Sequence, residues 1–375
     1  MKKVLSTMML LLMTTFLVSC IEKEELVKME ATPDSKVPYL DDIWVAVWAD
    51  EFDGDTLDMT KWSYEIDGGG GGNNELQYYT NNNTTVKDGI LTITAKKDDQ
   101  GHDYTSSRIV TRGKGDFTYG RIQASIKVPD GRGTWPAFWM MPTRSPHGIW
   151  PRSGEIDIME HVGYDNQMIH NSIHTLKYHH SVGTGRGNSI KIPTATTEFH
   201  LYEIIWEPGI IMGYVDGELY STFKYTAGFE REVEFYEVFP FYYDFFIILN
   251  LAIGGDWGGQ QGVDDSLFPH EYEIDFVRVY QKDYNYYDKA EPSQPSYVQE
   301  SAYLKNSIYW RESTDDMGVE LYNIYVDGEL HTTSPLSQVV LKRLEVGQTY
   351  EVTIEAVDFT GKVSELSEPI SFTYQ

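Results

Sequence analysis

The sequence predicts an all-β protein in which a large jelly-roll sandwich is followed by a smaller β-sandwich. Short apolar or alternating runs, separated by Gly, Asn, Asp and Pro, recur along most of the chain, as in strands joined by tight turns. Aromatic residues make up 14% of the chain, with 27 Tyr among them, and aromatic side chains favour strands. No long stretch has a helical period.

The larger unit is expected to begin near Trp44 and to span residues 41–282. Its predicted strands lie at 89–95, 120–128, 135–141, 155–161, 169–174, 201–206, 211–215, 245–252 and 272–280. A unit of about 240 residues is large for an immunoglobulin-type sandwich, and a jelly roll is therefore preferred.

The chain is longer than one typical domain, so a second folded unit is expected. Residues 283–295 are polar, contain two prolines and are interpreted as a linker. Residues 296–375 then have a strand pattern of their own, with predicted strands at 307–310, 322–326 and 350–357. This second unit is predicted to be a smaller β-sandwich.

The N-terminus resembles that of a bacterial lipoprotein. Two lysines precede an apolar stretch at 4–18, which is typical of a secretory signal and too short for a spanning helix of the mature protein. Residues 17–20 (LVSC) resemble a lipobox, in which Cys20 would become the lipidated first residue. The alternative is an ordinary cleaved signal with an incidental cysteine.

The expected organisation is a signal peptide at 1–19 and a flexible tether at 20–40. Residues 21–25 (IEKEE) resemble the surface-export tag of Bacteroidetes lipoproteins, which predicts a lipid anchor in the outer membrane at the surface of a Gram-negative cell. Cys20 is the single cysteine, so the folded part cannot form an internal disulfide. A net charge of −27 argues against a nucleic-acid partner and fits a neutral substrate. A monomer is expected, with membrane contact through the lipid alone.

Three carboxylates, Glu155, Asp157 and Glu160, lie in the run EIDIME. In a strand, alternate side chains share a face, so the first two acids point to one side while the isoleucines point to the core. Glu160 is out of this phase. A β-bulge at Ile158 or Met159 would return it to the face of the other two acids, and we expect such a bulge here.

Like charges on a half-buried strand repel one another and lose hydration, so the cluster is destabilising unless a proton, a cation or a substrate uses it. Two carboxyl groups about 5 to 5.5 Å apart are the geometry of retaining glycoside hydrolysis. On the pattern alone, an acidic edge strand or a calcium site stays open as an alternative. A surface helix fits the period of two less well.

Four further segments, together with the acidic run, resemble glycoside hydrolase family 16 in its laminarinase branch. They follow the order of that family: 73–80 (NNELQYYT), 131–140 (GRGTWPAFWM), 172–175 (SIHT) and 250–257 (NLAIGGDW). The resemblance covers about residues 41–282. It implies a concanavalin-like jelly roll that hydrolyses β-linked polysaccharides.

A second resemblance concerns the C-terminal unit. Residues 344–358 (LEVGQTYEVTIEAVD) are similar to the later strands of a fibronectin type III domain, an immunoglobulin-like fold, and Trp310 lies at the place of its early core tryptophan. Such domains usually act as spacers. A sugar-binding role is the alternative.

Position by position, the first resemblance implies that Glu155 is the nucleophile and Glu160 the acid/base. Asp157, between them, would hydrogen-bond the nucleophile and help to set its ionisation. The acid must hold a proton near neutral pH while its neighbour stays charged, and mutual repulsion pushes their pKa values apart. The expected reaction is retaining, endo-acting hydrolysis by double displacement.

The same resemblance implies substrate-binding residues beside the acids, namely Asn74, Trp135, Trp139, Trp150 and His174. Trp135 and Trp139 share a face if they lie on a strand, and their rings could stack on sugars. For either tryptophan, core filling is the alternative. Asn74 could instead be a turn residue, and His174 could be structural.

Glu51, Gly89 and Asp275 lie where some members of the family bind a structural calcium ion away from the cleft. Carboxylate and carbonyl oxygens suit calcium, although ordinary surface carboxylates are the alternative. The pair His179 and His180 lacks partners at zinc-ligand spacing. No cofactor is expected to be required for the reaction.

The first expectation for the substrate is β-1,3-glucan of the laminarin type. Mixed-linkage β-1,3-1,4-glucan follows, and then a β-galactoside chain such as host poly-N-acetyllactosamine. The loop at 67–73, with five consecutive glycines, and the aromatic stretch at 235–246 are expected to line the cleft ends and to affect this choice. A non-catalytic surface glycan-binding lipoprotein is the rival from another class, because it would use the same aromatic cleft.

Overall fold

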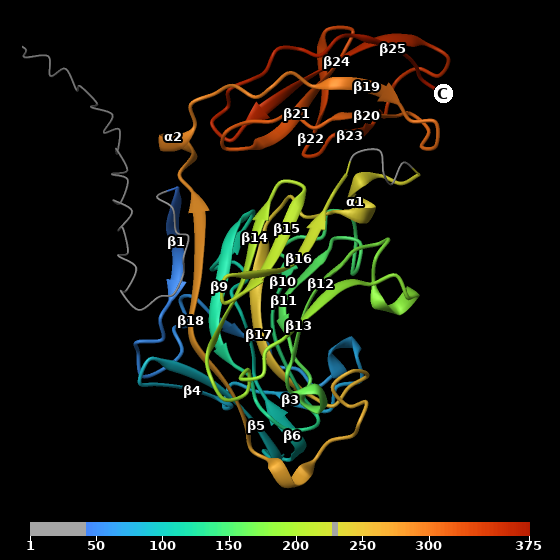
Figure 1. The fold of residues 1–375 in the computed structure, drawn as a ribbon. Coiled ribbons are helices and arrows are strands. Elements are labelled where there is room, and N and C mark those ends of the chain that lie inside the picture. The colour runs from blue at the N-terminus through green and yellow to red at the C-terminus, as the bar shows by residue number, and fades with distance from the viewer. Residues whose placement is uncertain (1–42, 227–231) are drawn as a thin grey trace, which may run out of the picture.

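The computed structural model describes residues 43–226 and 232–375. Within these residues the chain forms a large N-terminal β-sandwich and a small C-terminal one (Figure 1). No helix in these two ranges combines the length and the apolar character that a membrane crossing requires. The expected signal peptide at 1–19, Cys20 and the tether at 20–40 lie outside the described residues.

One sheet of the large sandwich contains β1 (Trp44–Asp50), β3 (Tyr78–Tyr79), β4 (Thr84–Lys87), β5 (Ile90–Asp99), β6 (His102–Ser106), β9 (Gly120–Lys127), β14 (His200–Glu207), β15 (Ile210–Val215), β16 (Glu218–Lys224) and β18 (His270–Lys282). The strands follow the order β16-β15-β14-β9-β18-β5-β6-β3, with β1 beside β18 and β4 beside β5. The pairing of β1 with β18 brings Trp44 opposite Lys282.

The other sheet contains β2 (Ser63–Tyr64), β7 (Arg108–Val110), β8 (Asp116–Phe117), β10 (Thr134–Pro142), β11 (Glu155–Glu160), β12 (Met168–His174), β13 (Arg186–Lys191) and β17 (Phe245–Ile253). Its order is β13-β12-β11-β10-β17-β7-β2, with β8 beside β17. The helices between strands are short: η1 (Gly70–Gly72), η2 (Gly163–Asp165), η3 (His180–Val182), α1 (Phe235–Val238), η4 (Asp265–Leu267) and α2 (Tyr284–Tyr287).

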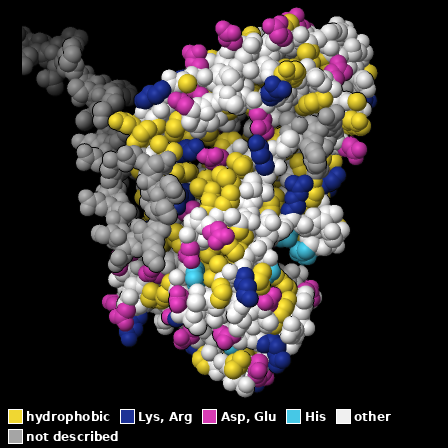
Figure 2. Space-filling view, viewed as in Figure 1, with side chains coloured by type: hydrophobic (Ala, Val, Ile, Leu, Met, Phe, Trp, Pro, Cys, Tyr) yellow, Lys and Arg dark blue, Asp and Glu magenta, His cyan; other side chains and the backbone are white. Residues whose placement is uncertain are grey.

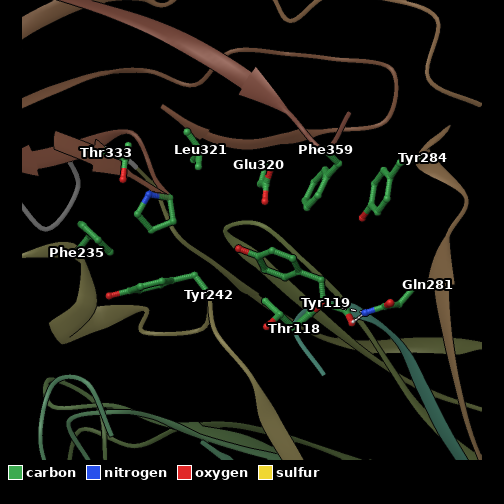
Figure 3. A pocket seen from close by; sticks show the side chains of 11 residues that line it. Thr118, Tyr119, Phe235, Tyr242, Gln281, Tyr284, Glu320, Leu321, Thr333 and Phe359 are labelled. Carbon is green, nitrogen blue, oxygen red and sulfur yellow. Dashed lines mark hydrogen bonds between the residues drawn. The ribbon is translucent and has the colours of Figure 1, made fainter. Parts of the chain in front are cut away.

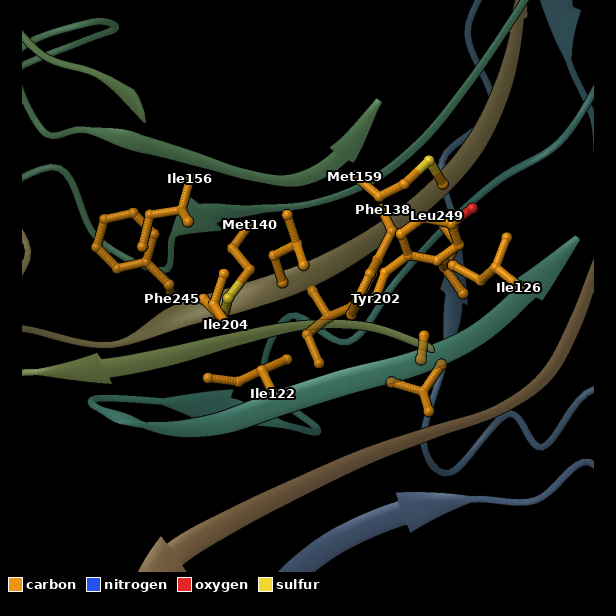
Figure 4. Packing of buried hydrophobic residues seen from close by; sticks show 14 of the residues in the cluster. Ile122, Ile126, Phe138, Met140, Ile156, Met159, Tyr202, Ile204, Phe245 and Leu249 are labelled. Carbon is orange, nitrogen blue, oxygen red and sulfur yellow. The ribbon is translucent and has the colours of Figure 1, made fainter. Parts of the chain in front are cut away.

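The core of the large sandwich lies between the two sheets. Phe138 and Met140 of β10 and Ile156 of β11 point toward Tyr202 and Ile204 of β14 (Figure 4), and all five side chains are 0% exposed. Burying a large apolar side chain stabilises a fold by about 1.5–3 kcal/mol. Because β10 and β11 have one face in this core, their other face is free to carry polar side chains.

The expected all-β jelly-roll sandwich is confirmed, and each strand predicted between residues 89 and 280 overlaps an observed strand. Strands such as β2, β3 and β8 were not expected, because two residues are too few to show a period. They form where neighbouring strands supply the hydrogen-bonding partners.

The small sandwich contains β19 (Ser296–Glu300), β20 (Ser307–Arg311), β21 (Val319–Val326), β22 (Glu329–Ser334), β23 (Gln338–Val340), β24 (Thr349–Asp358) and β25 (Ile370–Thr373). One of its sheets has the order β19-β20-β23 and the other β22-β21-β24-β25. Trp310 is 1% exposed and packs edge-to-face on Tyr322 in a core separate from that of the large sandwich.

The two sandwiches meet through aromatic and charged side chains. Tyr284 of α2 stacks on Phe359 with 4.2 Å between ring centroids, and Tyr119 contacts Phe359 edge-on at 5.9 Å. Nζ of Lys342 lies 3.2 Å from Oε2 of Glu234. A cavity of about 740 Å³ remains between the units, lined by Tyr119, Tyr284 and Phe359 among others (Figure 3).

Acidic side chains are spread over both units on the face seen in Figure 2.

Candidate active site

A β-bulge in β11 brings the three carboxylates to one face of the sheet. Strand β10 pairs Phe138 with Met159 but pairs the next residue, Trp139, with Asp157. Ile158 is therefore the additional residue, at one of the two positions expected from the sequence. Ile158 and Met159 both enter the core, at 1% and 0% exposed. The last glutamate of the strand is thus returned to the side of the other two acids.

Glu155, Asp157 and Glu160 all line one cavity of about 420 Å³. The cavity lies on the side of the second sheet that faces away from the core. Its walls also contain polar and aromatic side chains from other strands and from loops: Asn73, Glu75, Arg108, Trp135, Trp139, His170, His174, Asn250, Asp256 and Trp257.

Two neighbours of Glu155, Trp150 and His174, favour its charged form. The indole Nε1 of Trp150 donates a hydrogen bond to Oε2 of Glu155 at 2.8 Å. Nε2 of His174 lies 3.7 Å from the other carboxylate oxygen. The side chain of Glu155 is 16% exposed, which leaves it accessible from the cavity.

Asp157 is the most deeply buried of the three acids, with a side chain 3% exposed. Oγ of Ser172 donates to its Oδ2 at 2.5 Å, and Nε2 of His174 lies 3.2 Å from the same oxygen. Asp157 is also within hydrogen-bonding reach of Glu155. His174 therefore bridges Glu155 and Asp157 rather than lying against Glu160, and its expected contact with substrate stays a prediction.

Glu160 lies at the other end of the strand. Nε1 of Trp135 donates to its Oε1 at 3.0 Å, and His170 is its neighbour on β12. Among the described residues no cation lies within ion-pair distance of Glu160. The environment of this carboxyl group therefore does less to favour the charged form than that of Glu155.

Burial and neighbouring charge raise the pKa values of both glutamates. Burial first, and then the charge of Asp157, bring the pKa of Glu155 to about 8. The same two causes, in the same order, raise the pKa of Glu160 well above its usual range. For His174 burial acts to lower the pKa, but the hydrogen bond and charge of Asp157 outweigh it and raise the pKa to about 9.

The pKa values of both glutamates are raised, and their neighbours distinguish the two residues. The coupled pair loses its protons in two steps, and Glu155, beside the imidazolium of His174, loses its proton first. Between the two steps Glu155 is a carboxylate while Glu160 keeps its proton. That protonation state supplies a nucleophile and an acid on one side of a cleft.

The two expected tryptophans of β10 line the cavity and do not fill the core. Nε1 of Trp139 donates to Oδ1 of Asn250 at 2.7 Å, and the guanidinium of Arg108 lies 4.8 Å from the centroid of its ring. Trp135 packs edge-on against Trp257 at 5.5 Å. These contacts fix both ring planes, as stacking on a sugar requires.

Asn74 is exposed and adopts φ of 57°, and its Nδ2 donates to Oδ1 of Asp256 at 2.9 Å. Its neighbours Asn73 and Glu75 line the cavity, but Asn74 does not. The structure therefore gives Asn74 the geometry of a turn residue at the rim. Its direct contact with substrate stays a prediction.

Glu75 and Trp257 lie on the cavity wall, although neither is among the candidates named from the sequence. A signal was present, because both fall within the quoted motifs at 73–80 and 250–257. An isolated bridge between Glu75 and Gly254 brings the two motifs together. Contacts between two loops leave no periodic pattern in the sequence. The sequence alone therefore could not predict that Glu75 and Trp257 lie on the cavity wall.

The glycine-rich loop at 67–73 lies at the cavity, as expected. Gly71 has φ of 58°, and a Cβ there would lie 2.4 Å from the carboxylate of Glu75. Glycine therefore lets the backbone itself form this part of the wall.

The aromatic stretch at 235–246 was expected at a cleft end, and this was wrong. Phe241 and Phe245 are 0% exposed in the core. Phe235 and Tyr242 line the cavity between the two sandwiches instead (Figure 3). None of the residues at 235–246 lines the cavity that contains the three acids.

The three residues expected to bind calcium fit an ion poorly. Both oxygens of Glu51 accept hydrogen bonds from Arg278, at 2.7 Å each, and Asp275 is hydrogen-bonded to Ser125. Gly89 lies in the turn before β5 with φ of 77°. Calcium at this place stays a prediction, and no step of the chemistry depends on it.

Paired carboxyl groups in an aromatic-lined cleft of a jelly-roll sandwich define a glycoside hydrolase. The sequence profile described as Glycosyl hydrolases family 16 matches residues 72–278. The chain belongs to this family.

The chain is also similar to individual proteins with described activities. A Beta-glucanase of Rhodothermus marinus is 44% identical over 244 residues, which cover 63% of this chain and 85% of the relative. A Keratan-sulfate endo-1,4-beta-galactosidase of Sphingobacterium multivorum is 33% identical over 241 residues, covering 62% of this chain and 54% of that protein. The solved laminarinase of Rhodothermus marinus superposes with a TM-score of 0.60 at 47% identity, covering 64% of this chain and 98% of the laminarinase.

Proposed function

We infer that the protein is a retaining, endo-acting β-glycoside hydrolase that cleaves β-1,3-glucan of the laminarin type by double displacement. One observation supports this most directly: the bulge at Ile158 places Glu155 and Glu160 on the same face, in the same cavity. A protein that only binds glycans has no need for both carboxyl groups, so a purely binding role is disfavoured.

In the first step a carboxylate oxygen of Glu155 forms a bond to the anomeric carbon. The bond from that carbon to the leaving oxygen breaks, and Glu160 gives its proton to this oxygen. In the second step Glu160, now a carboxylate, takes a proton from water. The hydroxide formed attacks the anomeric carbon, the ester to Glu155 breaks, and the β configuration is restored.

The residues around the pair orient the substrate and tune the carboxyl groups. Trp150 and His174 stabilise the carboxylate of Glu155 when it is the leaving group of the second step. Trp135 holds Glu160 through its indole N–H and offers a ring face to a neighbouring sugar. The geometry thus serves both halves of the reaction.

β-1,3-Glucan is the proposed substrate because the Rhodothermus marinus proteins with the highest identities reported above are named beta-glucanase and laminarinase. Mixed-linkage β-1,3-1,4-glucan is the second candidate. An endo-β-galactosidase activity on poly-N-acetyllactosamine glycans is the third, supported by the similarity to a keratan-sulfate endo-β-galactosidase. The three share a β-glycosidic bond and differ in linkage position and in the sugar at each subsite.

Glu155→Ala and Glu160→Ala are each expected to lower laminarin hydrolysis by several orders of magnitude, because each removes one partner of the mechanism. Reducing-end release is measured for both variants and for Glu271→Gln, which changes an exposed glutamate of β18. Full activity in either alanine variant would refute the mechanism. Sizing of the products from laminarin, lichenan and poly-N-acetyllactosamine distinguishes the three substrates and shows endo or exo action.

NMR of the fresh product tests the stereochemistry separately. The β anomer is expected to appear first and to mutarotate later. Initial α product would mean inversion and would exclude Glu155 as a covalent nucleophile.

We propose that the C-terminal unit is a fibronectin type III-like spacer. Its two sheets and its buried Trp310 support this interpretation. We also propose a lipid anchor at Cys20 and a position at the outer surface of the outer membrane, on the basis of the N-terminal sequence. Incorporation of labelled fatty acid into the wild type and its loss in Cys20→Ala are expected, and absence of label in the wild type would exclude the anchor.

A further inference from the structure

A second group of carboxylates lies away from the cleft, where the linker reaches the C-terminal sandwich. Asp288 directly follows α2, Asp315 lies in the loop between β20 and β21, and Asp358 is the last residue of β24. Each offers one carboxylate oxygen such that all three oxygens lie within 4.8 Å of one another. Three segments that are distant in sequence thus converge on one point.

Two of these carboxylates each have an oxygen with no partner. Oδ1 of Asp358 accepts hydrogen bonds from the backbone N–H groups of Thr360 and Lys362, at 2.8 and 2.9 Å, and from the hydroxyl of Thr360, but its Oδ2 accepts none. Oδ2 of Asp315 accepts from the N–H groups of Met317 and Gly318, but its Oδ1 accepts none. The first set of contacts holds Asp358 in one orientation, and the second set does the same for Asp315.

The burial of these oxygens makes their lack of partners significant. Asp358 is 0% exposed and Asp288 is 8% exposed. Throughout residues 43–226 and 232–375, Asp315 and Asp358 supply the only buried carboxylate oxygens without a hydrogen-bond partner. Buried polar atoms are normally paired, because an unpaired one loses its hydration without compensation.

The negative charge of the three carboxylates is also only partly balanced. Nζ of Lys362 lies 2.6 Å from Oδ1 of Asp288, and the hydroxyl of Thr360 donates to the other oxygen of Asp288. One ammonium group thus faces three carboxylates, and the two unpartnered oxygens belong to Asp315 and Asp358, which do not form an ion pair with this ammonium group. A divalent cation would balance the remaining charge.

We propose that Asp288, Asp315 and Asp358 form a calcium site. Hard divalent cations take oxygen ligands, and calcium tolerates the irregular geometry that three separate segments supply, with water completing its coordination. The ion joins the linker, through Asp288, to the loop between β20 and β21 and to the end of β24. It therefore fixes the point at which that sandwich leaves the catalytic unit, close to the stacked pair of Tyr284 and Phe359.

Isothermal titration calorimetry of the purified chain, stripped with a chelator, tests the site with CaCl₂ as the probe. We expect binding with a Kd of roughly 10⁻³ M or tighter, the range of low-affinity calcium modules. Asp358→Asn and Asp315→Asn should each weaken it at least tenfold, because each removes a charged ligand. Lys362→Gln should tighten it, because the ammonium group competes with the ion for Asp288.

Two control variants keep this test specific. Asp327→Asn changes another aspartate of the same sandwich, whose Oδ1 accepts the backbone N–H of Glu351 at 2.8 Å, and it should bind calcium as the wild type does. Glu51→Gln removes the carboxylate expected at the other calcium position and should leave this binding event unchanged. Circular dichroism confirms that each variant is folded.

The other possible occupants give different results. Absence of calcium binding in the wild type would mean that water, or a proton shared between Asp288 and Asp358, fills the site, and the proposal would be overturned. Equal calcium affinity in the wild type and in both cluster variants would place the ion elsewhere and would also overturn it. Calcium should raise the unfolding temperature of the wild type and not that of Asp315→Asn.

Discussion

His174 is the neighbour that does most to lower the pKa of Glu155. It lies 3.2 Å from Asp157 and 3.7 Å from Glu155, and its raised pKa keeps it positively charged at neutral pH. That charge lowers the pKa of Glu155 and so opposes the effects of burial and of Asp157. A single imidazolium thus offsets part of the electrostatic repulsion between Glu155 and Asp157.

Replacing His174 by glutamine should move the acidic limb of the kcat/KM profile to higher pH. The reaction needs Glu155 as a carboxylate, and loss of the neighbouring positive charge raises the pKa at which that form appears. In the wild type the midpoint of the acidic limb should already lie at a pH well above the usual pKa of a glutamate, because the pKa of Glu155 is raised to about 8. An unchanged limb in the variant, measured on laminarin, would show that His174 does not act on Glu155.

Glu160→Gln should abolish turnover and yet stabilise the fold at neutral pH. The pKa of Glu160 is raised on folding, so folding opposes ionisation, and stability falls as pH rises above the unfolded pKa of about 4.3. The glutamine variant escapes this loss. Its gain in Tm should be small at pH 4 and should grow toward pH 8, by a few degrees.

Differential scanning calorimetry over this pH range measures that gain. Glu271→Gln, at an exposed position of β18, is the matched control and should show no such trend. A variant no more stable than the wild type at pH 8 would mean that burial of Glu160 costs the fold little.

At the scale of elements, the bulge in β11 is supported from both sheets. Nδ2 of Asn171 on β12 donates to the backbone carbonyl of Asp157 at 2.6 Å. Oγ of Ser221 on β16, in the other sheet, donates to Oδ1 of Asn171 at 2.5 Å. Asn171 is 0% exposed, so a buried amide holds the irregular part of the catalytic strand in place.

Asn171→Leu should lower kcat by about 10- to 100-fold with a smaller change in KM, because a misplaced carboxyl group affects the transition state more than binding. It should also destabilise the fold by about 1–3 kcal/mol through the unpaired hydroxyl and carbonyl groups. Ser221→Ala keeps the amide that contacts the bulge and should have a milder effect on kcat. Equal kcat in Asn171→Leu and the wild type would show that the bulge needs no such support.

The sequence revealed the bulge because an acidic residue was out of phase with its neighbours, and phase is a local property. It could not reveal Asn171, since a buried asparagine on a strand has no distinctive pattern. It also misplaced the aromatic stretch at 235–246, because a run of rings looks the same whether it packs in a core or lines a cleft. Contacts made by loops, such as that of Glu75 with Gly254, depend on the closed fold.

At the scale of the whole molecule, Phe359 links the two sandwiches. Phe359→Ala removes the ring between Tyr119 and Tyr284 and should lower the stability of the junction by about 1–3 kcal/mol, because the ring is only partly buried. Calorimetry should show the two units unfolding less cooperatively. Laminarin hydrolysis should be unchanged, because Phe359 does not line the cleft.

Phe199→Ala provides the control, since Phe199 is 38% exposed on the large sandwich. It should leave the calorimetric profile as it is in the wild type. A loss of hydrolysis in Phe359→Ala at temperatures where the large sandwich is folded would mean that the small unit contributes to the cleft.

Trp44 at the start of β1 pairs with Lys282 at the end of β18, so the first and last strands of the catalytic unit lie edge to edge. The chain therefore enters and leaves this unit at neighbouring points. A unit of this kind can be inserted between different neighbours, or circularly permuted with a short joining loop, without crossing the catalytic face. Recombination can therefore exchange the modules on either side while the reaction centre is inherited intact.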